Sequence, residues 1–390
     1  MKQAPRAWFS CLTDKLRAIG FRASKADPSL FIWHKNDVLV VILIYVDDII
    51  ITNNSGTAIH HVLQNLHSDF AVKELGDLSY FLGVEVLRST NDMYLTQRKY
   101  VAELLNRTHM AEAKPYTSPM STTCHVSTTE RVKFSDPSLY RQVVGSLQHL
   151  TFTRPDFSFS IHKVSKFMHN PLESHCQAVK RILRYLKHTI STRLFLRRSP
   201  NSAIQAFSDS DWAGDRDDRW SISAYCVFMG NNLILWRCKQ QFTVARSSIE
   251  AEYKSLADTA SELQWLQSIL SQIGLTIPTP PMLWYDNTGA TYLTANLMFH
   301  ARTKHIEIDF HYVRDQVQRK QRTVQFISTK DQLADSLTKP VSPRKFQTTL
   351  ANLNVRALPF RLRGCIEENV ELFSKSSNCS YQQEENLEED

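Results

Sequence analysis

Two adjacent carboxylates, Asp47 and Asp48, interrupt an apolar run, VLVVILIYVDDIII, that covers residues 38–51. The run predicts a strand buried on both faces, which turns at 46–48 and returns as a second strand over 49–52. Neighbouring carboxylates at a hairpin tip repel each other, so both ionise readily only where a cation lies beside them. Mg²⁺ prefers such hard oxygen ligands and keeps positions open for phosphate. A metal-free turn explains the pair equally well, because Asp is a favoured turn residue.

Four more carboxylates lie in the second half of the chain, namely Asp209, Glu252, Asp286 and Asp335. Asp209 follows a predicted strand over 203–207, and Asp286 follows another over 282–285. The carboxyl ends of strands in α/β sheets are where ligands gather, so these acids are candidate metal ligands. Two simpler explanations stay open: Asp286 as the cap of a following helix, and Asp335 as a surface acid paired with Lys339 four residues on.

Two glutamates near the start of a predicted helix over 248–273 can be distinguished by their neighbours. The segment Ser247-Ser248-Ile249-Glu250 fits a capping box, and Lys254 stands four residues after Glu250. Glu250 is therefore expected to face solvent. Glu252 lies on or beside the apolar stripe of the helix, where a carboxylate needs a partner such as a metal ion.

Length and composition exclude several classes of protein. A chain of 390 residues with 42% apolar residues predicts two or three domains with real cores. No apolar run is long enough for a membrane span and no signal peptide is evident, so an intracellular protein without a membrane partner is expected. The seven cysteines form no C-x-x-C pair, which argues against zinc knuckles and disulfides. No glycine-rich nucleotide loop is present.

The charge is divided unevenly along the chain. The total is +7, but residues 366–390 carry eight acids and one lysine, which leaves +14 on residues 1–365. The positive charge of residues 1–365 favours binding to a polyanion such as a nucleic acid. The acidic tail over residues 366–390 is expected to be disordered. A predicted helix over 173–188 has a basic face, which either follows a phosphate backbone or is simply solvated.

The sequence motifs around both sets of carboxylates resemble those of copia-type LTR retrotransposon Pol polyproteins. YVDD resembles the palm motif of reverse transcriptases, and Asp209, Glu252, Asp286 and Asp335 resemble the D-E-D-D set of ribonucleases H. The likeness covers roughly residues 2–364. Further motifs that match the family are KQAPRAWF, LGDLSYFLGVEV, YRQVVGSLQHLTFTRPD, SDSDWAGD, SSIEAEY, WYDN, HARTKHIEIDFHYVR and DQLADSLTKP.

This resemblance implies a multidomain chain of α/β and α+β class. The segments would be a partial reverse transcriptase palm with the start of a thumb, an irregular connector, a helical thumb or connection, an RNase H-like α/β domain, and a C-terminal extension ending in the acidic tail. Their predicted limits are 1–113, 114–138, 139–199, 200–342 and 343–390. The connector is also evident from its composition, with 13 Ser, Thr or Pro among 25 residues.

The resemblance also implies a chemistry and partners. The four later acids would hold two Mg²⁺ or Mn²⁺ ions that hydrolyse RNA paired with DNA, and Asp47 and Asp48 would be polymerase metal ligands on a template-primer. The nucleic-acid contacts implied in this way are Gln3, Arg302, Lys304 and His305. His305 would lie close to a histidine that assists turnover in ribonucleases H, but His300 and His311 lie equally near in sequence, so a structural role for each of them stays open.

One departure from the family pattern concerns the polymerase. The family has a further metal-binding aspartate in the motif before KQAPRAWF, and this chain begins after it. No DNA synthesis is expected from the chain alone, and the missing N-terminal part of the polyprotein is a possible partner. The alternative to an RNase H enzyme is a non-catalytic, nucleic-acid-binding relic of a transposon.

Overall fold

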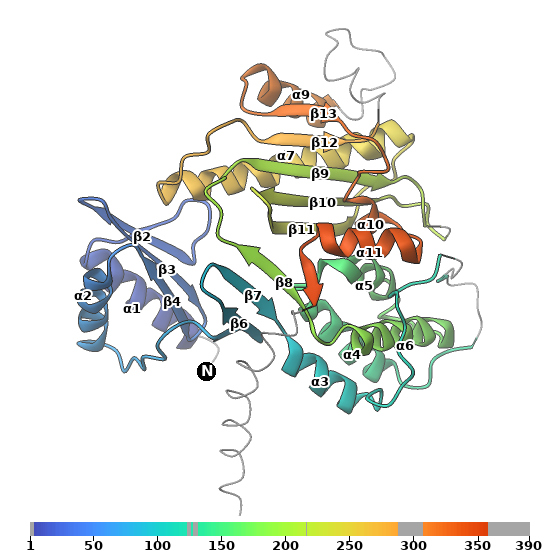
Figure 1. The fold of residues 1–390 in the computed structure, drawn as a ribbon, viewed down its shortest axis with the longest axis horizontal. Helices are drawn as coiled ribbons and strands as arrows, with labels where there is room; N and C mark the ends of the chain where they lie inside the picture. Colours follow the sequence, from blue (N-terminus) through green and yellow to red (C-terminus); the bar gives the residue numbers. More distant parts are fainter. Residues whose placement is uncertain (1–3, 123–125, 128–131, 216, 288–306, 358–390) are drawn as a thin grey trace, which may run out of the picture.

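The computed structural model describes residues 4–122, 126–127, 132–215, 217–287 and 307–357 (Figure 1). It contains three sheets with helices packed against them, so the predicted multidomain α/β and α+β class is confirmed. No helix within these ranges is long and apolar enough to cross a membrane.

The first sheet is an antiparallel meander in the order β1-β2-β3-β4. Its elements are α1 (Ala4–Ala18), β1 (Arg22–Ala23), β2 (Leu30–Lys35), β3 (Val38–Tyr45), β4 (Asp48–Asn53) and α2 (Gly56–His67). Alternate residues of β3, namely Val40, Ile42 and Ile44, are buried in one cluster with residues of α1 and α2, while those between are half-buried. The expected burial of both faces is therefore wrong, because both helices contribute to a single core.

The second sheet gathers segments from distant parts of the chain, in the order β14-β8-β7-β6-β5, with every pairing antiparallel. Its strands are β5 (Tyr80–Phe81), β6 (Val84–Arg88), β7 (Asp92–Thr96), β8 (Thr192–Arg197) and β14 (Val355–Ala357). Helices beside it are α3 (Arg98–Arg107), α4 (Pro137–Leu150), α5 (Ser158–Ser165), α6 (Glu173–His188) and α11 (Pro343–Asn352).

The end of the described chain returns to this helical block. Phe346 and Leu350 of α11, followed by Leu353 and Val355, belong to the same buried cluster as α4 and α6. Part of the predicted C-terminal extension is thus folded, and the predicted acidic tail lies outside the described residues. The five domain limits remain a prediction.

Two arginines on the basic face of α6 hold the connector. Arg181 donates to Ser118 Oγ at 2.9 Å, and Arg184 donates to the carbonyl oxygen of Lys114. Both guanidinium groups stack on the Tyr116 ring, at 4.5 and 4.0 Å from its centroid. These two side chains therefore serve packing and are not simply solvated.

The third sheet has the order β11-β10-β9-β12-β13, with β12 parallel to both β9 and β13 and the other pairings antiparallel. The elements are β9 (Ile204–Asp211), β10 (Ile222–Met229), β11 (Asn232–Gln240), α7 (Ser248–Gln272), β12 (Met282–Tyr285), α9 (Glu307–Gln318), β13 (Thr323–Phe326) and α10 (Asp335–Thr338). Three antiparallel strands, a long helix and two parallel strands form the α/β domain expected over residues 200–342, which keeps the name RNase H-like domain from that expectation.

Strand β10 shows how this sheet is enclosed. Its residues alternate between two cores: Tyr225 and Val227 pack in the cluster that contains α7, while Ala224, Cys226 and Phe228 pack in the cluster of the helical block. Both faces of the strand are buried as a result. The neighbouring strand β9, which pairs with β10, is therefore held in place by packing on both faces of the sheet.

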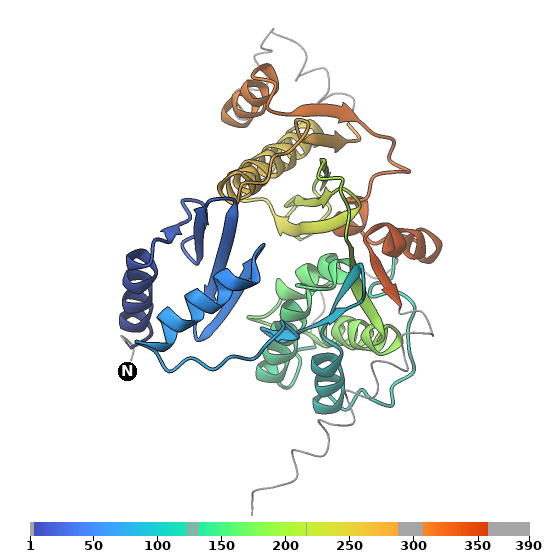
Figure 2. The ribbon, with the colours of Figure 1, turned by 60° about the vertical axis from the view of Figure 1, so that its left-hand side comes forward.

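The N-terminal unit lies against the end of α7 (Figure 2). Trp265 Nε1 donates to the carbonyl oxygen of Ala26 at 3.1 Å, and the Lys25 amide donates to Gln272 Oε1 at 3.0 Å. The contact joins the palm-like sheet to the RNase H-like domain through two polar bonds.

Candidate metal centre

Three carboxylates from separate elements meet at one edge of the third sheet. Asp209 lies near the carboxyl end of β9, and Asp286 directly follows the parallel neighbour β12. Asp335 reaches them from the start of α10. One carboxylate oxygen of each lies within 4.8 Å of the others. Parallel pairing explains the meeting, because it brings the carboxyl ends of β9 and β12 to the same edge.

The fourth predicted acid, Glu252, faces the same cluster from α7. Its carboxylate is close enough to Asp209, Asp286 and the Ser210 backbone for these groups to affect its pKa, but it is not one of the three carboxylates that meet within 4.8 Å. Burial, followed by the charges of Asp209 and Asp286, raises the pKa of Glu252 to about 9. The side chain therefore holds a proton at neutral pH unless a cation approaches.

Asp209 is almost fully buried, with 2% of its surface exposed. Burial is the main cause that raises its pKa to about 7, and the charges of Asp335 and Asp286 add to it. The Thr338 hydroxyl donates to Asp209 Oδ2 and opposes this rise, as does the nearby Lys339. Asp209 and Glu252 thus ionise less readily than ordinary carboxylates, because they are buried among other acids. Their hard oxygens fit Mg²⁺ or Mn²⁺, which would compensate the repulsion.

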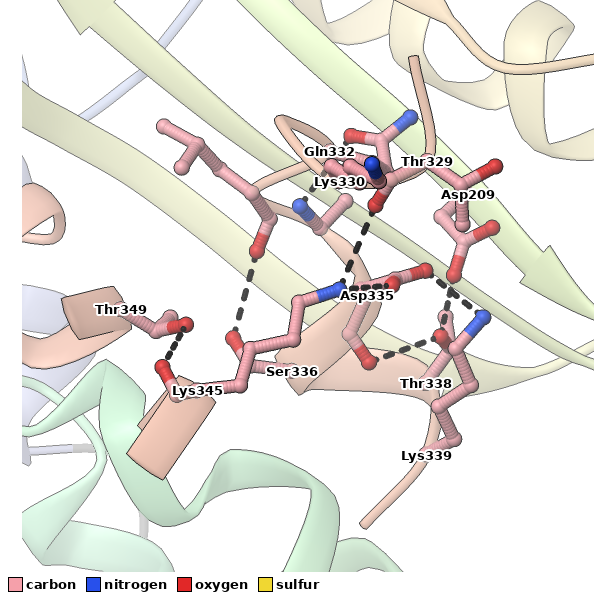
Figure 3. A network of polar contacts seen from close by, with 12 residues as sticks. Asp209, Thr329, Lys330, Gln332, Asp335, Ser336, Thr338, Lys339, Lys345 and Thr349 are labelled. Atoms are coloured by element: carbon pink, nitrogen blue, oxygen red, sulfur yellow. Dashed lines mark hydrogen bonds and ion pairs between the residues drawn. The ribbon is translucent and has the colours of Figure 1, made fainter. Parts of the chain in front are cut away.

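Two lysines hold Asp335 from opposite sides (Figure 3). Lys339 Nζ lies 2.7 Å from Asp335 Oδ1, and Lys345 Nζ of α11 donates to Oδ2 at 2.6 Å. The predicted ion pair between Asp335 and Lys339 is therefore present. Asp335 is nevertheless not a surface acid, because only 1% of it is exposed. A lysine from outside the third sheet therefore helps to orient a carboxylate of the candidate metal centre.

Replacing Lys345 with Met is expected to lower the free energy of unfolding by about 1 kcal/mol in the absence of divalent ions. The change leaves the buried Asp335 with one cation fewer, and the loss stays small because the Lys345 side chain is 35% exposed and water screens it. Denaturant titration measures the effect. Lys330→Met is the matched control, because Lys330 is exposed. Equal losses in both variants would show that the Lys345–Asp335 pair contributes nothing.

Glu250 corrects one expectation. Ser247 Oγ accepts the N–H of Glu250 at 3.1 Å, and Lys254 Nζ lies 2.7 Å from its carboxylate, so the capping contact and the i+4 pair are confirmed. The solvent-facing orientation is wrong, because Glu250 is only 4% exposed. Its carboxylate also accepts the amide of Arg246 at 2.8 Å, and these donors make burial of the charge tolerable.

The Asp47–Asp48 turn is a tight hairpin at the edge of the first sheet. Tyr45 pairs with Asp48, which leaves Val46 and Asp47 as the two-residue loop. Val46 has a φ of 49°, a strained conformation for a β-branched residue. Both aspartates are exposed. Among the described residues, the only group of three or more potential metal-ligating side chains is the Asp209 cluster, so the turn itself offers two carboxylates.

The remaining predicted contacts cannot be placed. Gln3, Arg302, Lys304 and His305 lie outside the described residues. In contrast, the structure adds Thr338 and Lys345, which the sequence did not single out. Thr338 carries no spacing signal, and the role of Lys345 depends on how α11 folds back.

Comparisons with known proteins agree with these observations. Residues 1–122 match the family described as reverse transcriptase (RNA-dependent DNA polymerase). The chain is 48% identical over 359 residues to the retrovirus-related Pol polyprotein from transposon RE1 of Arabidopsis thaliana, which covers 92% of this chain and 24% of that protein. Over 358 residues it is 33% identical to the Pol polyprotein from transposon TNT 1-94 of Nicotiana tabacum, covering 89% of this chain and 27% of the relative.

A solved structure of the foamy viral protease-reverse transcriptase in complex with dsDNA is also similar, with 12% identity, a TM-score of 0.45, and coverage of 84% of this chain and 59% of that one. The chain spans about a quarter of the length of the curated Pol relatives. On the identity shared along most of its length, the chain belongs to the retrovirus-related Pol polyproteins of copia-type LTR retrotransposons.

Proposed function

We propose that the RNase H-like domain hydrolyses the RNA strand of an RNA/DNA hybrid with Mg²⁺ or Mn²⁺ held by Asp209, Glu252, Asp286 and Asp335. The observation that carries this proposal is the meeting of three carboxylates within 4.8 Å at the sheet edge, with Glu252 beside them. Membership of the Pol family supports a nucleic-acid substrate. The net charge of +14 on residues 1–365 would attract such a polyanion.

Each side chain has a distinct part in this proposal. Bound divalent ions would supply charge for the attacking and leaving oxygens of the phosphodiester. Burial and the neighbouring acids favour the neutral forms of Asp209 and Glu252 when no ion is bound, so ion binding displaces protons. Thr338 orients Asp209, and the two lysines orient Asp335. The enclosed sheet keeps these positions fixed before substrate arrives.

The direct test uses the full chain with a labelled RNA/DNA hybrid. RNA fragments are expected in Mg²⁺ or Mn²⁺, none in EDTA, and none from the same sequence as duplex DNA. Hybrid binding that weakens steeply with salt, without cleavage in either metal, would instead support a non-catalytic relic.

The polymerase motif is proposed to be inactive in this chain by itself. The Asp47–Asp48 turn brings two carboxylates together, and no third carboxylate joins them among the described residues. Primer extension on an RNA template is therefore expected to stay at background in preparations that cleave the hybrid. Extension that is lost on Asp48→Asn would show a complete polymerase site and would overturn this part of the proposal.

A further inference from the structure

Arg322 is a buried arginine that has no acidic partner within the described part of the chain. It directly precedes β13 and is 2% exposed, and none of its three guanidinium nitrogens has a hydrogen-bond partner among the described residues. Arg154 provides the contrast within the same chain. It is 3% exposed, and its guanidinium donates to both carboxylate oxygens of Asp156 at 2.9 and 2.8 Å.

An unpaired buried charge is unfavourable, because water no longer solvates it and no counter-ion replaces that water. Burial accordingly lowers the pKa of Arg322, but an arginine keeps its proton at any physiological pH. The guanidinium therefore remains a cation in need of an anion.

A pocket of about 540 Å³ lies beside this side chain. Its polar lining includes Gln264, Gln267, Gln316, Lys320 and Arg322, and no aspartate or glutamate lines it. Tyr312 influences the pKa of Arg322 and donates to Gln264 Oε1 at 2.6 Å, which puts the guanidinium on the side of α7 and α9. The local composition is therefore cationic and rich in amide donors.

The pocket is separate from the metal centre. Arg322 lies at the amino end of β13, and residues 277–280 of the pocket lie just before β12, whereas Asp286 follows the carboxyl end of β12. Because β12 and β13 are parallel, the two sites lie at opposite ends of the strands. An anion in the pocket would not compete with the metal ligands.

We propose that this pocket is a binding site for a phosphate-type oxyanion, with Arg322 as its principal donor. The planar guanidinium offers two parallel N–H groups to an oxyanion, and Lys320 and the glutamine amides supply further donors. The guanidinium nitrogens are covered in this state, so binding of the oxyanion includes a movement of side chains at the pocket that uncovers them. The phosphate is either free or part of a nucleic-acid backbone.

Thermal unfolding of the full chain in EDTA tests the site, with sodium phosphate against sodium chloride at equal ionic strength. Phosphate at roughly ten times its Kd is expected to raise Tm by about 2–4 °C. Arg322→Leu is expected to abolish this rise and to leave Tm in chloride equal or higher, because leucine removes the unpaired charge. Arg319→Leu is the control, since Arg319 is an exposed arginine three residues away.

Two further arms complete the test. An unchanged phosphate response in Arg322→Leu, or no response in the wild-type chain, would overturn the proposal. Binding of an RNA/DNA hybrid then distinguishes the source of the phosphate: weaker binding by Arg322→Leu indicates a backbone phosphate, and unchanged binding indicates a free one. Asp209→Asn should keep the phosphate response, so failure of the anion site and failure of the nuclease proposal are separate outcomes.

Discussion

Replacing Asp209 with Asn is expected to reduce cleavage of the RNA/DNA hybrid by about 10³-fold or more. The change keeps the shape of the side chain and replaces a carboxylate that meets those of Asp286 and Asp335 within 4.8 Å. Metal ions stabilise transition-state charge by several kcal/mol, and a loss of about 4 kcal/mol corresponds to three factors of ten in rate. Single-turnover cleavage with saturating enzyme measures the loss in the chemical step.

The same variant reports on folding independently of activity. Asp209 is destabilised in the empty site by burial and by Asp335 and Asp286, so Asn at this position is expected to leave the Tm in EDTA equal or higher. Asp315→Asn, an exposed carboxylate on α9, is the control and should cleave normally. A folded Asp209→Asn protein that cleaves at the wild-type rate would refute the metal-centre assignment.

The spacing of residues close together in the sequence was sufficient to predict several parts of the fold and of the candidate site. The apolar run before Asp47 predicted the β3–β4 hairpin, and the placing of Asp209 and Asp286 after strands predicted acids at a shared sheet edge. The cap formed by Ser247 was likewise visible from its spacing to Glu250. In each case the signal lies within about ten residues, where spacing directly determines geometry.

Features that depend on distant segments were not predictable in this way. One-sided burial of β3 depends on where α1 and α2 pack. Lys345 reaches Asp335 only because α11 returns to the helical block. Arg322 was not singled out from the sequence, since its burial follows from the packing of α7 and α9 beside β13. No local pattern encodes such contacts.

Without divalent ions, the stability of the RNase H-like domain is expected to fall as pH rises between about 5 and 9. The folded-state pKa of Glu252 is about 9 and that of Asp209 about 7, both above the values of the unfolded chain. Within this window the folded protein holds protons that the unfolded chain has released, so raising the pH favours unfolding. Each such group contributes up to about 1.4 kcal/mol per pH unit.

Mg²⁺ should remove most of this dependence, because the ion neutralises the carboxylates that otherwise need protons. Denaturant unfolding at pH 5.5, 7.0 and 8.5, in EDTA and in MgCl₂, measures both effects. Glu252→Gln is expected to flatten the curve in EDTA, since a permanently neutral side chain has no proton to lose, and to weaken stabilisation by Mg²⁺. Glu262→Gln, a change on the same helix at a surface pair with Arg237, should leave both curves unchanged. If stability in EDTA were instead constant or rose with pH, the carboxylates would not repel one another in the folded state, and they would not need a divalent ion.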